Sequence, residues 1–111
     1  MILTFPESAQ HHCDEQDLTR SAMQLAALGS ETRLALFRLL VEWGDRGLNT
    51  GEISEKLGLA GSTLTHHLMT LETAGLIARR REGRNIRCHF LAPAMEGLVA
   101  YLTRNCCREA S

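Results

Sequence analysis

Two adjacent cysteines near the end of the chain, Cys106 and Cys107, carry the most distinctive chemistry in this sequence. Arg104 and Arg108 flank them, and nearby positive charge favours the thiolate, the form of cysteine that acts as ligand and nucleophile. Vicinal thiolates can close on one soft, thiophilic centre where a helix frays at its end. Because thiolates are soft ligands, they favour soft centres over hard ions. The candidates are trivalent arsenic or antimony, and also copper(I) and cadmium.

The other two cysteines have different surroundings. Cys13 is a candidate third thiol, because an N-terminal arm could lie near the last helix. Three thiols complete a trigonal site for inorganic arsenite, whereas the Cys106–Cys107 pair alone fits a monomethylated trivalent arsenical equally well. Cys88 lies within a strand-like segment, so we expect a small buried residue rather than a ligand.

Two alternative uses of these thiols stay open. The Cys106–Cys107 pair could sense thiol oxidation or persulfide instead of a metalloid. Cys13 together with His11, His12 and Asp14 could form a zinc or nickel site in the N-terminal arm.

Enzyme signatures are missing from the sequence. It contains no CxxC at a helix start, no phosphate-binding loop and no Cys/His/Asp constellation, so we do not expect an enzyme. The first ten residues lack the basic and long apolar regions of a signal peptide. No apolar run approaches the roughly 20 residues that span a bilayer, so we expect a cytoplasmic protein without a membrane partner.

Charge is distributed unevenly, although the formal net charge is only −1. Residues 1–78 contain five Lys and Arg against ten Asp and Glu, and residues 88–111 contain two of each sign. Residues 79–87 (RRREGRNIR) contain five Arg against one Glu. Arginine suits phosphate because its planar guanidinium donates two hydrogen bonds at once. The segment is therefore a candidate nucleic-acid contact in an otherwise acidic chain.

Hydrophobic periodicity predicts the helices that must position these groups. Ser30 is expected to cap the second helix, Thr50 the third, and Ser62 or Thr63 the fourth, while Pro93 suits the first turn of the last. The apolar stripes at helical spacing are, in chain order, Leu18, Ala22, Leu25, Ala26 and Leu28; Leu34, Phe37, Leu40 and Val41; Ile53 and Leu57; Leu64, Leu68 and Leu71; and Met95, Leu98, Val99 and Leu102.

Strand-like segments complete the order of elements. One short strand fits at Leu48, and residues 77–81 and 85–91 form two strands around a turn at 82–84. We expect a mainly α fold with a small β-hairpin, in one domain over residues 14–111 preceded by a flexible arm at residues 1–13. Two short helices joined by a Gly-containing turn and followed by a hairpin are typical of a winged helix-turn-helix.

In a helix-turn-helix, the second helix enters the major groove with its N-terminal residues on the bases. Here that end carries Ser62, Thr63, Thr65 and His66, while Leu64 points to the core. Hydroxyl groups can donate to or accept from base edges and phosphates, and the free N–H groups of a helix N-terminus favour phosphate. We therefore expect these four side chains to contact double-stranded DNA.

The strings LGSETRLALF (residues 28–37), STLTHHL followed by a spaced Leu and GL (62–76), and the RRREGR hairpin (79–84) resemble the ArsR/SmtB family of bacterial metalloregulatory repressors. The resemblance covers about residues 20–102. It implies a winged-helix homodimer, paired through its first and last helices, that leaves an imperfectly palindromic operator when an inducer binds.

The same resemblance assigns DNA contacts to Ser62, Thr65 and His66, with hairpin contacts near Arg81 and Arg84. Gly61 departs from the family, in which Gln or Ser often precedes the recognition helix.

Members of the family bind their inducers at different sites, and this chain lacks the ligating residues of three of those sites. The helix before the turn has no Cys-x-Cys box, the last helix has no His and only one acid, and the second helix has no Cys. Some arsenic-responsive members resemble this chain in carrying an adjacent Cys pair at the end of the last helix. The resemblance therefore implies a repressor released by As(III), Sb(III) or a methylated trivalent arsenical at Cys106 and Cys107.

Overall fold

Helices and a three-stranded sheet make up residues 12–105, the part of the chain that the computed structural model describes, with the backbone alone for residues 12–14. The elements are α1 (His12–Leu28), α2 (Glu31–Trp43), the 3-10 turn η2 (Gly44–Arg46), β1 (Leu48–Asn49), α3 (Thr50–Leu57), α4 (Gly61–Thr73), β2 (Ile77–Glu82), β3 (Asn85–Phe90) and α5 (Ala92–Thr103). This order confirms the predicted winged helix-turn-helix, mainly α with a small hairpin. Most of the arm expected at residues 1–13 lies outside the described residues, and its last two residues already belong to α1.

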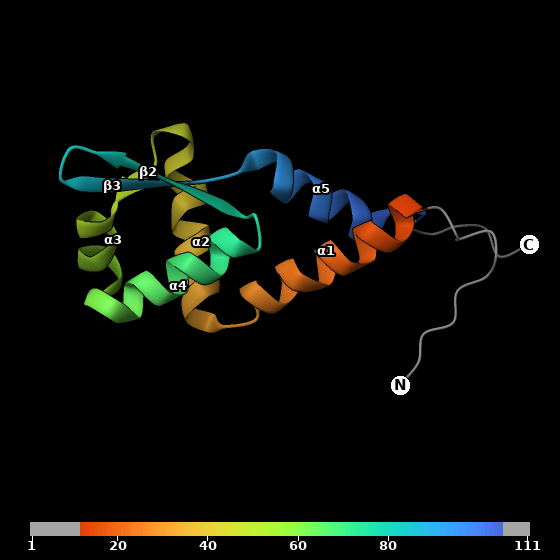
Figure 1. Ribbon diagram of the computed structural model, residues 1–111, viewed down its shortest axis with the longest axis horizontal. Helices are drawn as coiled ribbons and strands as arrows, with labels where there is room; N and C mark the ends of the chain where they lie inside the picture. The colour runs from red at the N-terminus through yellow and green to blue at the C-terminus, as the bar shows by residue number, and fades with distance from the viewer. Residues whose placement is uncertain (1–11, 106–111) are drawn as a thin grey trace, which may run out of the picture.

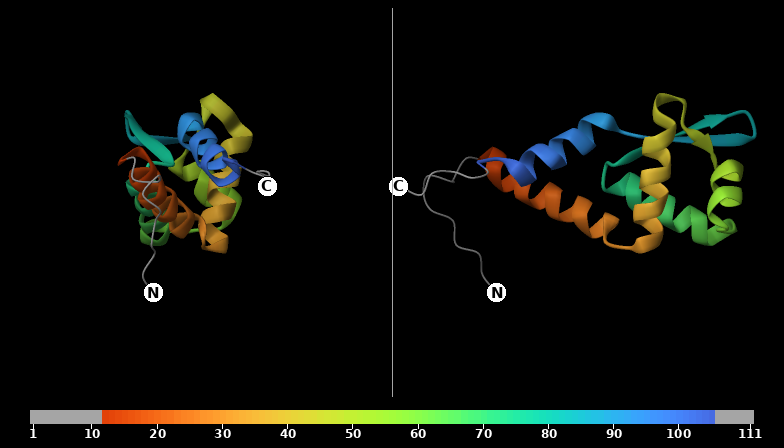
Figure 2. Two further views of the ribbon diagram at one scale, coloured as in Figure 1. Left: turned by 90° about the vertical axis from the view of Figure 1, so that its right-hand side faces the viewer. Right: turned by 180° about the vertical axis from the view of Figure 1, so that it is seen from behind.

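Helices α2, α3 and α4 pack with the sheet, whereas α1 and α5 lie side by side and reach away from it (Figures 1 and 2). The start of α1 and the end of α5 therefore lie together, at the end of the molecule opposite the hairpin (Figure 1).

The sheet has the strand order β1–β3–β2, with both pairings antiparallel. Leu48 pairs with Cys88, which confirms the short strand expected at Leu48. In the hairpin, Ile77 pairs with Phe90 and Glu82 with Asn85, so the turn consists of Gly83 and Arg84. Gly83 has φ of 60°, the left-handed region that two-residue hairpin turns require and that glycine adopts without strain.

A single apolar cluster lies between α2, α3, α4 and the sheet. Its fully buried members include Leu36, Leu40, Ile53, Leu68, Leu71, Leu76, Ile77 and Cys88. The stripe predicted on α4 is confirmed, but the stripe predicted on α2 is wrong at one position. Leu34 is 46% exposed and Leu36 is fully buried, because the face of α2 that meets α4 and β3 passes through Leu36, Phe37 and Leu40.

The helix starts confirm one predicted cap and correct two. Ser30 caps α2 by accepting a hydrogen bond from Arg33 N. Asn49, rather than Thr50, caps α3, because Asn49 and Glu52 exchange side-chain-to-backbone hydrogen bonds of 2.8 and 2.9 Å in a reciprocal capping box. Helix α4 begins at Gly61, so the expected cap, Ser62 or Thr63, already lies inside the helix, and the N-cap residue Ala60 provides no side-chain hydrogen bond.

The apolar stripe expected on α1 lies largely on the surface of the single chain. Leu25 is 44% exposed, whereas the side that faces α4 and α5 buries the polar residues Ser21 and Gln24. Val99 and Leu102 of α5 are likewise more than half exposed. Among the described residues, no helix is long and apolar enough to cross a membrane.

Candidate nucleic-acid interface

The N-terminal end of α4 presents a row of polar side chains to solvent. Ser62, Thr63, Thr65 and His66 are all exposed, while Leu64 between them is 4% exposed and anchors the helix in the core. Since Ala60 provides no side-chain cap, the first N–H groups of α4 have no side-chain acceptor. This end of the helix therefore offers hydroxyl, imidazole and backbone N–H groups on one surface, the donors and acceptors that base edges and phosphates can match.

Gly61 at the start of this row has φ of 40°. An L side chain is strained in that region, so the backbone itself favours glycine at this position.

The hairpin arginines differ in their partners. Arg79 pairs with Glu72 at 2.9 Å, whereas Arg80 and Arg87 both pair with Glu82, at 3.2 and 2.8 Å. Hydrogen bonds from Arg87 and then Arg80 lower the pKa of the Glu82 carboxyl and keep it ionised. These three arginines therefore have acidic neighbours that offset their charge.

Arg81 and Arg84 are exposed at the hairpin tip and form no ion pair within residues 12–105. They are the two hairpin positions singled out from the sequence. Their guanidinium groups are available to phosphate without first breaking an internal salt bridge.

A contact missed by the sequence analysis links α4 to α1 and α2. Arg33 Nε donates a hydrogen bond to Ala27 O at 2.6 Å, and Arg33 Nη1 lies 3.2 Å from His67 Nδ1. His67 is half-buried and directly follows the exposed His66. Desolvation, with Arg33 and His66 as further causes, lowers the pKa of His67 below its ordinary 6.5. Since the two residues are 34 apart in the chain, no local pattern pairs them.

The cysteines are only partly covered by the structure. Cys106 and Cys107 lie outside the described residues, and Cys13 is in α1 with no described side chain. Cys88 is a free, fully buried thiol whose pKa is raised to about 11 by desolvation, which confirms the expected structural role. Within the described residues, no group of three or more His, Cys, Asp or Glu could hold a metal ion.

One ion pair joins α1 to the residue that follows α5. Arg104, the residue after α5, lies 3.3 Å from Asp17 Oδ2 of α1. Cys13 precedes Asp17 by about one helical turn, and Cys106 follows Arg104 by two residues.

Comparison with known proteins gives a consistent result. A family described as a helix-turn-helix domain matches residues 28–80. The chain is 41% identical over 58 residues to the uncharacterised HTH-type transcriptional regulator YceK of Bacillus subtilis, a match that covers 52% of this chain and 57% of YceK. It is 28% identical to the transcriptional activator HlyU of Vibrio cholerae, over 85% of this chain and 84% of HlyU.

Two further matches name the same type of protein. The putative arsenical resistance operon repressor ArsR2 of Halobacterium salinarum is 31% identical, over 63% of this chain and 58% of the relative. An ArsR-like transcriptional regulator from Rhodococcus sp. RHA1 has a solved structure that matches with a TM-score of 0.70 at 25% identity, over 80% of this chain and 81% of that one. The chain thus spans less than two thirds of the length of YceK and ArsR2.

Proposed function

The chain belongs to the ArsR/SmtB family of winged helix-turn-helix transcriptional regulators, and we propose that it is a dimeric repressor whose operator binding ends when a thiophilic metalloid binds near its C-terminus. The family is one of DNA-binding transcription regulators and not of enzymes. The DNA contacts, the dimer and the inducer are three separate parts of the proposal, each with its own support and test.

The observation that carries DNA recognition is the combination of an exposed α4 N-terminus with two hairpin arginines that have no internal ion pair. Ser62, Thr63, Thr65 and His66 read bases or the adjacent backbone, and Arg81 and Arg84 bind phosphates beside them. Since phosphate contacts supply much of the affinity and base contacts the specificity, the two groups have separable effects.

The test selects bound duplexes from a randomised pool and then measures affinity at about 50 to 200 mM salt. We expect an enriched imperfect palindrome, and an affinity that falls steeply as salt rises. Thr65→Ala should lower the preference for the selected duplex over a scrambled one by roughly ten-fold. Thr73→Ala, exposed at the other end of α4, is the matched control and should leave the preference unchanged. A pool without enrichment, or affinity independent of salt, contradicts DNA reading and favours a protein-interaction domain.

Exposed apolar residues on α1 and α5 support the dimer. Leu25 is 44% exposed, Val99 55% and Leu102 56%, which is unusual for large apolar side chains on two adjacent helices. A twofold dimer would bury both sets in one interface and present two α4 helices to successive major grooves. Leu102→Glu should convert the dimer to a monomer in sedimentation experiments, whereas Thr103→Glu on the neighbouring position should not. A monomeric wild-type chain at micromolar concentration contradicts this part.

The inducer site proposed is Cys106 and Cys107, with Cys13 as a third thiol. The support is the Asp17–Arg104 ion pair, since Asp17 of α1 follows Cys13 by four residues and Arg104, after α5, precedes Cys106 by two. The relative named as a putative arsenical resistance operon repressor agrees with As(III) or Sb(III) as inducer. Three thiols would bind arsenite, and the pair alone would bind a methylated trivalent arsenical.

The experiment measures release of the selected duplex during titration with arsenite, antimonite and a monomethylated trivalent arsenical. Cys106→Ser and Cys107→Ser should abolish release by all three. Cys13→Ser should weaken release by arsenite and spare release by the methylated arsenical. Cys88→Ala, a buried thiol outside the proposed site, is the control and should respond like the wild type.

Two outcomes would keep the DNA-binding function but identify a different inducer. Release by peroxide or polysulfide but not by arsenite would identify a thiol-oxidation or persulfide sensor. A zinc or nickel response that disappears when residues 1–14 are deleted would identify the His11–Asp14 arm as the sensor.

A further inference from the structure

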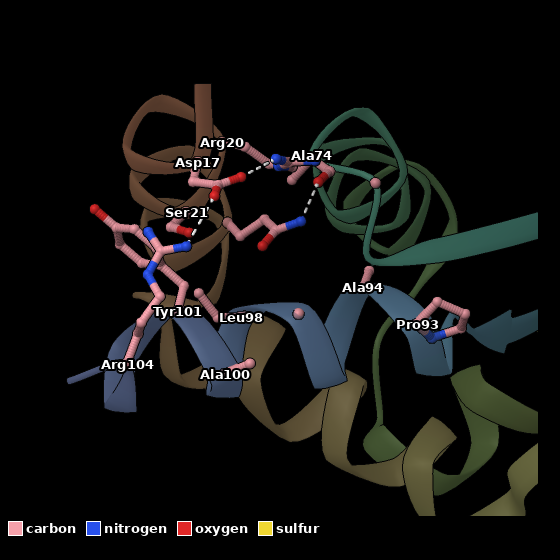
Figure 3. Close-up of a pocket in the computed structure, with 13 residues that line it drawn as sticks. Asp17, Arg20, Ser21, Ala74, Pro93, Ala94, Leu98, Ala100, Tyr101 and Arg104 are labelled. Carbon is pink, nitrogen blue, oxygen red and sulfur yellow. Dashed lines mark hydrogen bonds and ion pairs between the residues drawn. The ribbon is translucent and has the colours of Figure 1, made fainter. Parts of the chain in front are cut away.

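A cavity of about 500 Å³ lies between α1 and α5, beside the turn from α4 to β2 (Figure 3). Its volume is within the range of small-molecule sites in proteins, about 300 to 1,000 Å³. None of the residues proposed to contact DNA or the inducer lines it. The cavity is therefore distinct from the proposed DNA and inducer sites.

The three charged residues at one end of the cavity are held together by ion pairs, with one carboxylate between two guanidiniums. Asp17 accepts hydrogen bonds from Arg20 and from Arg104, and the Arg104 guanidinium also lies 4.9 Å from the centre of the Tyr101 ring. Figure 3 shows Asp17 between the two arginines. A cationic ligand would be repelled by the two arginines, and an anionic ligand would have to displace Asp17 from both of them, so the cavity favours an uncharged ligand.

Two neutral polar side chains of α1 line the cavity with hydrogen-bonding capacity unused. Ser21 is only 5% exposed, and its hydroxyl makes no hydrogen bond to any described residue. Gln24 is 4% exposed; its Nε2 donates to Ala74 O at 3.3 Å, but its Oε1 receives no donor from residues 12–105. Neither oxygen is fully enclosed, since His89 Nδ1 is the one fully buried side-chain polar atom without a partner among the described residues, so water reaches Ser21 Oγ and Gln24 Oε1. A ligand group that both donates and accepts a hydrogen bond, such as a hydroxyl, could bond to the Ser21 hydroxyl and to Gln24 Oε1 at once.

The opposite wall is apolar, and two of its residues, Ala94 and Gly97, are small. Ala94, Gly97 and Leu98 of α5 face the cavity, and a Cβ added to Gly97 would meet no atom within 4 Å. The wall thus leaves open space instead of close packing, although glycine within a helix is less favourable than alanine by up to about 1 kcal/mol. This space suits a flat apolar body.

We propose that this cavity binds a small uncharged organic molecule with an apolar body and one hydroxyl or amide group. The polar group donates to Gln24 Oε1 and accepts from the Ser21 hydroxyl, while the body lies against Ala94 and Gly97. Because Gln24 also holds Ala74 O, the C-cap residue of α4, the ligand contacts a side chain that is hydrogen-bonded to the end of the recognition helix. The site does not depend on the function proposed above.

The test titrates the full ¹⁵N-labelled chain with 2-naphthol, an uncharged probe with one hydroxyl group, and follows backbone amide shifts. We expect saturable shifts confined to residues 17–24, 74–75 and 94–104, the segments that line the cavity. The charged analogue 2-naphthoate should bind at least about five-fold more weakly, and Ser21→Ala should weaken 2-naphthol about five-fold through loss of one hydrogen bond.

Variants at Gly97 test the location. Gly97→Leu should abolish 2-naphthol binding by filling the cavity, and Gly97→Ala should weaken it while raising the melting temperature. Thr103→Leu adds similar bulk to an exposed position of α5 outside the cavity and should bind like the wild type.

Three results would overturn the proposal. They are the absence of saturable shifts, shifts centred on Met23 and Met69 in the groove between α1 and α4, and a Gly97→Leu variant that loses its dimer. The last would mean that a side chain of a second copy fills the cavity.

Discussion

His67 Nδ1 lies 3.2 Å from Arg33 Nη1, so a side chain of α4 contacts a guanidinium that also holds the last turn of α1 through Ala27 O. A guanidinium can only donate hydrogen bonds, so His67 must accept with an unprotonated Nδ1. The orientation of the recognition helix thus depends on a neutral histidine.

Protonation of His67 is therefore expected to destabilise the fold. Its pKa is lowered mainly by desolvation, then by Arg33 and His66, so the unfolded chain binds this proton more readily than the folded chain. Both states are neutral well above the ordinary pKa of 6.5, and the free energy of unfolding falls as the pH drops below that value. From about pH 7.5 to about pH 5.5, the melting temperature should fall more for the wild type than for His67→Gln.

His66→Gln is the control for this measurement, because His66 is exposed and its ring makes no contact with Arg33. It should keep most of the pH dependence of the wild type, because His66 is the smallest of the three causes that lower the pKa of His67. Equal pH dependence of the wild type and His67→Gln would show that the Arg33–His67 contact does not respond to protonation.

The hairpin arginines should separate into two groups in DNA binding. Arg84→Ala should lower the affinity for the selected duplex roughly ten-fold and reduce the slope of log affinity against log salt by about 1. Arg80→Ala also removes one positive charge, but the Arg80 side chain is already paired with Glu82. It should therefore lower the affinity and the salt slope less than Arg84→Ala does. Fluorescence anisotropy at several salt concentrations measures both. Equal losses in the two variants would mean that the ion pairs at Glu82 do not persist near DNA.

Cys88 should be the slowest thiol to react. It is fully buried, and its pKa of about 11 leaves little thiolate at neutral pH. Iodoacetamide followed by peptide mass spectrometry should label Cys88 in denaturant and leave it unlabelled in the native chain. Cys88→Ser should lower the free energy of unfolding by about 1–3 kcal/mol, because it buries a hydroxyl in an apolar site. Rapid native labelling at Cys88 would contradict its place in the core.

The start of α3 offers a direct comparison of two adjacent residues. Asn49→Ala removes the side-chain acceptor of the capping box and should cost about 1 kcal/mol of unfolding free energy. Thr50→Ala should be close to neutral, since Thr50 is already the first helical residue. Urea unfolding of the two variants measures the difference. A larger loss for Thr50→Ala would support the cap that the sequence predicted.

Local patterns in the sequence predicted the order of elements, the helix-turn-helix and the hairpin. Apolar spacing, Ser30 and Gly83 act over a few residues, so their effect can be read without the rest of the fold. Asn49 and Thr50 both carry side chains that can cap a helix, and the prediction of Thr50 was wrong. The reciprocal hydrogen bonds between Asn49 and Glu52 decide that Asn49 caps α3. The start of α4 at Gly61 was missed for a similar reason, since Ala60 carries no capping side chain.

Sequence alone predicted which residues contact DNA: the small polar side chains at the start of α4 and the one basic segment of the chain. Tertiary structure decided which hairpin arginines have acidic partners, that Leu36 replaces Leu34 in the core, and that Ser21 and Gln24 of α1 face a cavity. It also brought Arg33 to His67 across 34 residues. The physical reason is the distance along the chain over which each interaction acts. Periodicity and caps act within one helix, whereas burial and ion pairing depend on groups a few ångströms away in space, which can be any number of residues apart in the sequence.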